Sequence, residues 1–231
     1  MSQTLSEATY KGDAYDAGMT LRGVITDWGG VLTEPLAEAT RKWLALERID
    51  AATYRDTMRS WFTAAYAGGT TENLIHRLED GSLEPAEFER LLAAELRLTD
   101  GSPVVPDGLL DRMFAEFAPV DSMYEVIQAC RTGGFRTALL SNSWGNTYPR
   151  DRWTGLFDAV VISGEVRMRK PSPEIFHHAL EALGLEAAQC VFIDDIEANI
   201  EAAERVGMVG LHHTDPGKTR AALSDLLKVD L

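Results

Sequence analysis

The stretch LRGVITDWGGVLT, residues 21–33, joins a short apolar run to a carboxylate and two glycines. Its residues 23–25 lead into Asp27, and an apolar run bounded by turn residues is typical of a buried strand in a parallel sheet. A carboxylate at the carboxyl end of such a strand lies where open α/β sheets bind ligands. Gly29 and Gly30 allow the backbone to turn sharply there. Taken alone, the stretch fits a solvated aspartate in a glycine turn better than a ligand-binding site. Whether it has a function therefore depends on the rest of the chain.

The chain after this stretch divides into a helical block and an alternating block. Apolar residues recur at helical spacing up to residue 119, which predicts helices over 36–49, 51–67, 71–78, 85–96 and 106–117. After residue 120 we expect strands over 136–140, 157–162, 190–193 and 208–211, and helices ending near residues 131, 183, 206 and 227. Strands that alternate with helices predict βαβ units and a parallel sheet. The expected organisation is therefore an N-terminal extension (1–20), an α/β core domain (21–33 and 120–231) and an inserted all-helical cap domain (34–119).

Composition limits the classes of partner. The formal net charge of −14 disfavours nucleic acid and anionic membranes, which require basic patches, but allows a small anionic substrate if a metal or local cations are present. Cys130 and Cys190 each lie next to apolar residues, so we expect buried free thiols rather than a disulfide framework. No run approaches the ~18 apolar residues of a membrane span, and residues 1–20 lack the apolar segment of a secretory signal. We expect a cytoplasmic protein, either a monomer or a homodimer.

Four polar signals fall at the ends of expected strands. They are Asp27, Ser141, Lys170 after the third strand, and the pair Asp194-Asp195. Three carboxylates at one sheet edge repel one another and require a cation, and oxygen ligands without histidine or cysteine favour Mg²⁺. A carboxylate beside such a metal can attack a phosphoryl group, while the metal, a lysine and a hydroxyl neutralise its charge. The pattern predicts phosphoryl transfer, although Asp27, Ser141 and Lys170 taken one at a time would each be more typical of a turn or an exposed surface.

These segments, in order, resemble motifs I to IV of the haloacid dehalogenase-like (HAD) superfamily: VITDWGGVLT, ALLSN, RKPSPEIF and VFIDDIEANIEAA. The helical block between the first two motifs resembles the C1 cap of HAD subfamily I. The segments GSLEPAEFERLL and SNSW resemble the branch that includes the N-terminal phosphatase domain of epoxide hydrolases and bacterial sugar-phosphate phosphatases. The resemblance implies a Rossmann-like core and a Mg²⁺-dependent phosphatase that hydrolyses a small phosphorylated metabolite through an aspartyl-phosphate.

The resemblance also implies a role for each metal-site residue. Asp27 would be the nucleophile and a Mg²⁺ ligand, and the backbone carbonyl of Gly29 would be the second ligand. Asp194 would be the third ligand, and Asp195 would bind the metal directly or through water.

The remaining motif residues would bind the substrate. Ser141 and the backbone amide of Asn142 would hold the phosphoryl oxygens, and Lys170 would pair with Asp27 and the phosphate. Trp28 and Trp144 flank motifs I and II. They either line the substrate pocket or pack between cap and core.

The sequence departs from the family pattern at Gly29, where most HAD phosphatases have a second aspartate that protonates the leaving group. General acid–base help is worth roughly 10²–10⁴-fold, so three interpretations stay open. The favoured one is that the substrate has a good leaving group or that another group supplies the proton, with His76 of the cap as a candidate. The second is a catalytically impaired binding or interaction protein. The third is another HAD reaction, such as that of a dehalogenase or a phosphonatase, and it fits less well. Dehalogenases do not keep the paired aspartates seen here as Asp194-Asp195. Phosphonatases use a cap lysine as a Schiff base, and Lys42 is the only lysine that this cap offers.

Overall fold

A computed structural model describes residues 20–66, 73–145 and 148–231. Its centre is a five-stranded sheet in the order β3-β2-β1-β4-β5, and every neighbouring pair is parallel. The strands are β1 (Gly23–Thr26), β2 (Arg136–Ser141), β3 (Ala159–Ile162), β4 (Cys190–Asp194) and β5 (Val209–His212). The predicted α/β fold with a parallel sheet is confirmed. The expected extension 1–20 falls almost wholly outside the described residues.

The strand order places β1 in the middle of the sheet. Ile25 of β1 is paired with Ala138 of β2 on one side and with Phe192 of β4 on the other. The chain adds β2 and β3 on one side of β1 and then crosses to add β4 and β5 on the other. In open α/β sheets, ligands bind at the carboxyl ends of the strands where the order reverses in this way. The fold therefore brings the residues that follow β1, β2 and β4 together at one edge.

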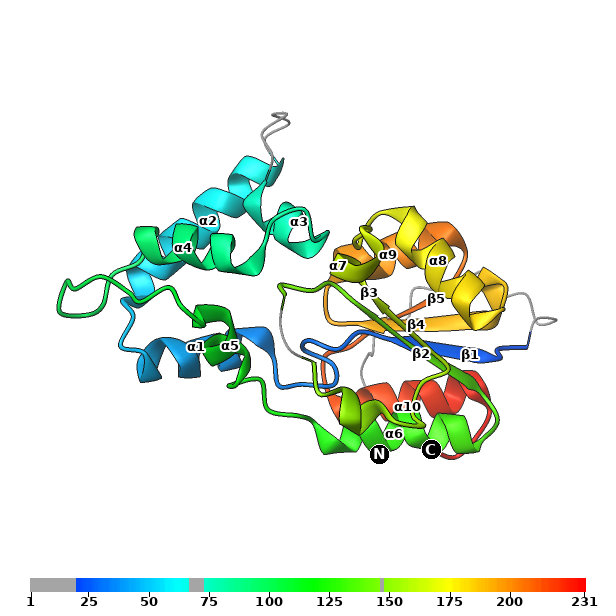
Figure 1. The fold of residues 1–231 in the computed structure, drawn as a ribbon. Helices are drawn as coiled ribbons and strands as arrows, with labels where there is room; N and C mark the ends of the chain where they lie inside the picture. Colours follow the sequence, from blue (N-terminus) through cyan, green and yellow to red (C-terminus); the bar gives the residue numbers. More distant parts are fainter. Residues whose placement is uncertain (1–19, 67–72, 146–147) are drawn as a thin grey trace, which may run out of the picture.

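Helices cover both faces of the sheet (Figure 1). The pair α6 (Asp121–Thr132) and α10 (Pro216–Leu227) lies on one face, and the pair α8 (Pro173–Leu183) and α9 (Glu197–Val206) lies on the other. Successive strand side chains point to opposite faces, so Val24 joins the core on the first face and Ile25 joins the core on the second. Burial on both faces explains why the strands read as continuous apolar runs.

In the part of the chain that the structure describes, five helices between β1 and α6 form a separate group, which we call the cap helices. Figure 1 shows them beyond the edge of the sheet at which β1 ends. They are α1 (Leu36–Leu46), α2 (Ala51–Tyr66), α3 (Leu74–Glu79), α4 (Pro85–Glu95) and α5 (Leu109–Phe114). The division into a core domain and a cap domain at residues 34 and 119 stays a prediction.

Three helices begin at different residues than expected, each for a local reason. Helix α3 begins at Leu74 because the Asn73 side chain accepts hydrogen bonds from two backbone amides of its first turn. Helix α10 begins at Pro216, whereas the sequence predicts a start near Thr219, because the Asp215 side chain accepts from the Lys218 amide at 3.1 Å. Helix α5 begins three residues late, because Gly108 has a left-handed backbone (φ +69°).

Short helical turns were not expected from the sequence. They are α7 (Ser163–Val166), η1 (Arg150–Trp153) and η2 (Ala187–Gln189). None of the described helices combines the length and the apolar character that a membrane crossing requires.

Candidate active site

Three carboxylates meet at the carboxyl edge of the sheet. Asp27 follows β1, Asp194 is the last residue of β4, and Asp195 comes next in the chain. One oxygen from each lies within 4.8 Å of the others. They converge because β1 and β4 run parallel in register and end side by side. Asp194 is fully buried and Asp27 is 7% exposed.

The three carboxylates together form a site that fits a cation. Asp195 Oδ1 is buried and has no hydrogen-bond partner among the described residues. An unpaired buried oxygen of this kind is costly, so it indicates a ligand that the protein itself does not supply. Gly30 leaves the room that Asp195 occupies, since a Cβ at position 30 would lie 2.2 Å from Asp195 Oδ2. An all-oxygen set of three carboxylates suits a hard cation such as Mg²⁺.

Burial sets the protonation of these groups. It raises the pKa of Asp27 to about 7, with added repulsion from Asp194 and Asp195 and opposing attraction from Lys170. It also raises the pKa of Asp195 to about 6, again with repulsion from Asp194. A divalent cation held by these oxygens would favour their ionised forms and lower both pKa values.

Lys170 is the buried cation of the site. Its Nζ lies 2.7 Å from Asp194 Oδ2 and 3.0 Å from Asp27 Oδ1. Burial lowers the pKa of Lys170, but the attraction of Asp194 and Asp27 outweighs burial and raises it, so the ammonium stays charged. The Asn142 side chain fixes the Lys170 backbone, because its Oδ1 accepts from Lys170 N at 2.9 Å and its Nδ2 donates to Lys170 O at 3.0 Å. Asn142 thus orients Lys170, a contact that the sequence did not suggest.

Ser141 lies at the end of β2 and has a partner that sequence reasoning missed. The hydroxyls of Ser141 and Tyr148 are 2.9 Å apart and share a hydrogen bond. Tyr148 is buried and packs edge-on against Trp28, with ring centroids 4.9 Å apart. A single tyrosine in a loop has no sequence signature, so only the structure reveals it.

A cavity of about 210 Å³ lies over these groups, between the sheet edge and the cap helices. Every site residue predicted from the sequence lines it except Asp194, which lies beneath: Asp27, Trp28, Gly29, Ser141, Asn142, Trp144, Lys170 and Asp195. The two tryptophans also pack between segments. Trp28 stacks on Phe117 with ring centroids 6.2 Å apart, and Trp144 contacts Phe88 of α4 at 5.6 Å. Trp28 and Trp144 thus line the cavity and also pack against neighbouring segments, and their role in binding a substrate stays a prediction.

Glu79 is a titratable cap residue in this cavity that the sequence did not single out. Its side chain is 15% exposed, its Oε2 lies 3.3 Å from Arg169 Nε, and its Oε1 accepts from Trp144 Nε1 at 3.4 Å. Burial raises the pKa of Glu79, and Arg169 opposes that shift. A lone glutamate before an Asp-Gly turn gives no functional signal in a sequence. His76, the expected candidate, is not among the residues that line the cavity, and burial with the nearby Arg169 lowers its pKa.

The sequence model of one protein family, the haloacid dehalogenase-like hydrolases, matches residues 21–207 of the chain. The chain belongs to this family. The membership predicted from the four motifs is confirmed, and the protein is a hydrolase of the HAD type.

Curated relatives carry phosphatase and epoxide hydrolase names. Sesquiterpene phosphatase astK of Aspergillus oryzae is 43% identical over 72 residues, which cover 31% of this chain and 37% of that protein. Bifunctional epoxide hydrolase 2 of Rattus norvegicus is 26% identical over 230 residues, 91% of this chain and 39% of that protein. The chain thus spans less than two fifths of these two relatives. Phosphatase MT3486 of Mycobacterium tuberculosis is 29% identical over 212 residues, covering 87% of this chain and 91% of that protein.

Solved structures share the fold. An HAD family enzyme of Bacteroides thetaiotaomicron, crystallised with magnesium and inorganic phosphate, superposes with a TM-score of 0.58 at 21% identity. The match covers 84% of this chain and 94% of that one.

Proposed function

We propose that this HAD hydrolase is a Mg²⁺-dependent phosphatase that hydrolyses a small phosphate monoester through an aspartyl-phosphate on Asp27. One observation carries the proposal: Asp27 lies in a cavity beside a buried lysine and beside a carboxylate oxygen, Asp195 Oδ1, that lacks a protein partner. The phosphatase names of two relatives and the magnesium and phosphate bound to a structural neighbour support it.

The residues that would hold Mg²⁺ are Asp27, Asp194, Asp195 and the backbone carbonyl of Gly29. When bound, the ion would neutralise negative charge on the phosphoryl oxygens and keep Asp27 ionised. Lys170 would neutralise further charge at the same place. The Ser141 hydroxyl, held by Tyr148, and the Asn142 backbone amide would bind the phosphoryl oxygens.

The reaction would proceed in two displacements at phosphorus. An Asp27 carboxylate oxygen forms a bond to phosphorus while the bond from phosphorus to the ester oxygen breaks, and that oxygen takes up a proton. A water oxygen then attacks phosphorus, loses a proton, and displaces Asp27 as inorganic phosphate forms. Asp27 Oδ1 accepts from Trp28 N at 2.7 Å and from Lys170, which fixes the orientation of the carboxylate for this attack.

The proton that Gly29 cannot supply would come from Glu79. This carboxyl lines the cavity from the cap side, and burial raises its pKa, which favours the protonated form that a general acid needs. Glu79 would donate its proton to the leaving oxygen in the first displacement. As a carboxylate it would accept a proton from the attacking water in the second. Arg169 and Trp144 would hold its orientation.

Release of phosphate from p-nitrophenyl phosphate tests the proposal. We expect turnover in the presence of Mg²⁺, its loss on chelation with EDTA, and its loss in Asp27→Asn. Equal rates for wild type and Asp27→Asn would refute the assignment. Binding of vanadate with Mg²⁺ but without any turnover would instead favour the impaired binding protein that Gly29 suggests.

A further inference from the structure

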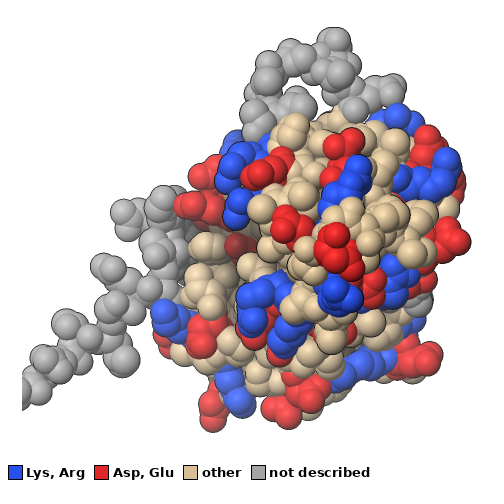
Figure 2. Space-filling model, turned by 90° about the vertical axis from the view of Figure 1, so that its left-hand side faces the viewer, with Lys and Arg blue, Asp and Glu red and all other residues tan. Residues whose placement is uncertain are grey.

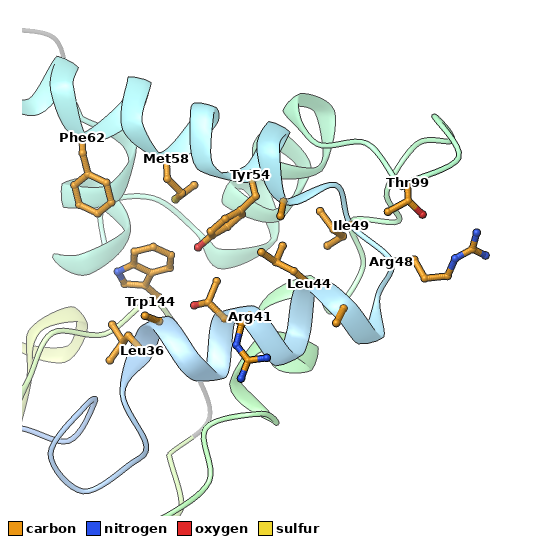
Figure 3. A pocket seen from close by; sticks show the side chains of 14 residues that line it. Leu36, Arg41, Leu44, Arg48, Ile49, Tyr54, Met58, Phe62, Thr99 and Trp144 are labelled. Carbon is orange, nitrogen blue, oxygen red and sulfur yellow. The ribbon is translucent and has the colours of Figure 1, made fainter. Parts of the chain in front are cut away.

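A second cavity adjoins the catalytic one inside the cap. It has a volume of about 670 Å³ and lies between α1 and α2 (Figure 3). The two cavities share five lining residues: Leu36, Thr40, Tyr54, Phe62 and Trp144. The shared residues place the two cavities side by side, so a ligand whose phosphate lies at Asp27 would pass Leu36 and Trp144 to reach the second cavity. We call this second cavity the cap groove.

Most of the side chains that line the cap groove are apolar. Figure 3 shows Tyr54, Met58 and Phe62 of α2 turned toward α1, with Leu44 of α1 opposite them. Ile49 continues the apolar wall toward the end far from Trp144.

Charged side chains occur only at the margins of the groove among its lining residues. Arg41 lies within 3.7 Å of Glu38, and Arg48 lies 3.4 Å from Asp100, and both arginines are mostly exposed. Figure 2 shows basic and acidic residues interspersed on this end of the molecule, so the groove is not part of a field of one sign. The groove can therefore make apolar contacts with a long ligand. It has few groups that would bind a second phosphate.

Two large apolar side chains at the junction of the cavities are left uncovered. Leu36 is 42% exposed and Phe62 is 41% exposed, and both line both cavities. Exposed apolar groups that gather at a cavity mark a binding site rather than ordinary surface. An apolar ligand in the groove would cover them.

The two cavities differ in volume, and the volume decides which part of a ligand each can hold. Pockets that enclose a whole small ligand have volumes of about 300–1,000 Å³. The catalytic cavity, at about 210 Å³, has room for the phosphoryl group and the first atoms of the alcohol. The cap groove, at about 670 Å³, is within the range for a ligand and holds no catalytic group of its own.

We infer that the cap groove binds the apolar tail of the substrate, so that the physiological substrate is the phosphate monoester of a long apolar alcohol. This inference rests on the proposed phosphatase function and names its substrate class. The phosphate would lie between Asp27 and Lys170, and the tail would run between α1 and α2. Each methylene that the groove buries strengthens binding by up to about fourfold.

Calorimetric titration with alkylphosphonates, which are not hydrolysed, tests the inference apart from catalysis. Ethyl-, hexyl- and decylphosphonate are titrated with Mg²⁺ present, below their micelle concentrations. We expect Kd to fall with chain length, by at least tenfold from ethyl to decyl. Equal Kd values along the series would overturn the inference, even if p-nitrophenyl phosphate is hydrolysed. Absence of that hydrolysis with a falling Kd would instead refute only the proposed function.

Two neighbouring residues of α1 provide a matched pair of variants. Ala45 lines the groove and Leu46 does not, and both are exposed, so a tryptophan at either position is expected to fold. Ala45 is nine positions from Leu36, about 14 Å along the helix axis, so Ala45→Trp would shorten the groove at its far end. We expect Ala45→Trp to remove the gain from hexyl- to decylphosphonate and Leu46→Trp to keep it. The same chain-length series in both variants would contradict the inference.

Discussion

At the scale of single residues, the most informative position is Gly29. A Cβ there would approach Leu36 Cδ1 of the cap to 3.3 Å, so the cap lies over the place where a side chain at position 29 would point. The family's usual proton donor is thus absent, and an apolar cap residue faces its position. If the protein hydrolyses esters with poor leaving groups, the proton has to come from elsewhere in the cavity, and among the described residues Glu79 is the cap carboxyl that lines it.

Replacement of Glu79 tests this assignment. We expect Glu79→Gln to lower kcat for alkyl phosphates by about 10²–10⁴-fold, because their leaving oxygen requires a proton. Hydrolysis of p-nitrophenyl phosphate should fall far less, because its leaving group is stable as an anion. The measurement is kcat across esters of increasing leaving-group pKa. Glu84→Gln, an exposed cap glutamate outside the cavity, is the control and should match wild type. Equal loss for all esters in Glu79→Gln would contradict a role as general acid.

At the scale of elements, the turn after β1 shapes the metal site. Gly30 has a backbone φ of +77°, and its missing side chain leaves room for the Asp195 carboxylate. We expect Gly30→Ala to displace Asp195 and to weaken Mg²⁺ binding at least tenfold, measured by titration calorimetry.

Gly134 is the matched control for that turn. It also has a positive φ, +89°, but a Cβ there meets nothing within 4 Å. Both alanine variants should lose about 1–2 kcal/mol of stability, since both place a Cβ on a left-handed backbone. Only Gly30→Ala should affect Mg²⁺. Equal Mg²⁺ affinity in the two variants would argue against the metal site.

The core elements and the cap elements differ in how far the sequence predicts them. Asp27, Ser141 and Asp194 end apolar runs, and parallel strands share one carboxyl edge, so their convergence follows from pattern alone. Glu79 and Tyr148 could not be predicted, because each reaches the site only through the way its segment folds over that edge. Their neighbours in the chain carry no periodic pattern that points to a cavity. The same holds for the cap groove, which exists only because α1 and α2 lie face to face.

Helix ends were predictable only to the extent that capping was recognised. Asn73 and Asp215 are both side chains that cap helices, and both start their helices at residues that apolar periodicity misplaces. Periodicity identifies which residues face the core. The first residue of a helix, in contrast, depends on one polar capping side chain that lies outside the repeat.

At the scale of the whole molecule, the site makes stability depend on pH. Burial raises the pKa of Asp27 to about 7 and that of Asp195 to about 6, both above the ordinary value of 3.8. The folded state therefore binds these protons more tightly than the unfolded chain does. This contribution to stability is complete below about pH 4 and is lost as the pH rises through 6 to 7.

Thermal melts of the metal-free protein test this dependence. We expect Asp27→Asn to melt at a higher temperature than wild type at pH 8, and the difference to shrink at pH 5, where wild-type Asp27 is protonated. Added Mg²⁺ should stabilise wild type at pH 8 by about 2.7 kcal/mol at one hundred times its Kd. A difference between the two proteins that is the same at both pH values would contradict the raised pKa of Asp27.

We propose that phosphoryl transfer passes through Asp27. Mass spectrometry of the protein, quenched in acid during turnover of p-nitrophenyl phosphate with Mg²⁺ and digested, tests it most directly. We expect the mass of one phosphoryl group on the peptide that contains Asp27, and its absence from Asp27→Asn and from EDTA-treated protein. Steady turnover with no such adduct, or an adduct on a peptide without Asp27, would contradict the account.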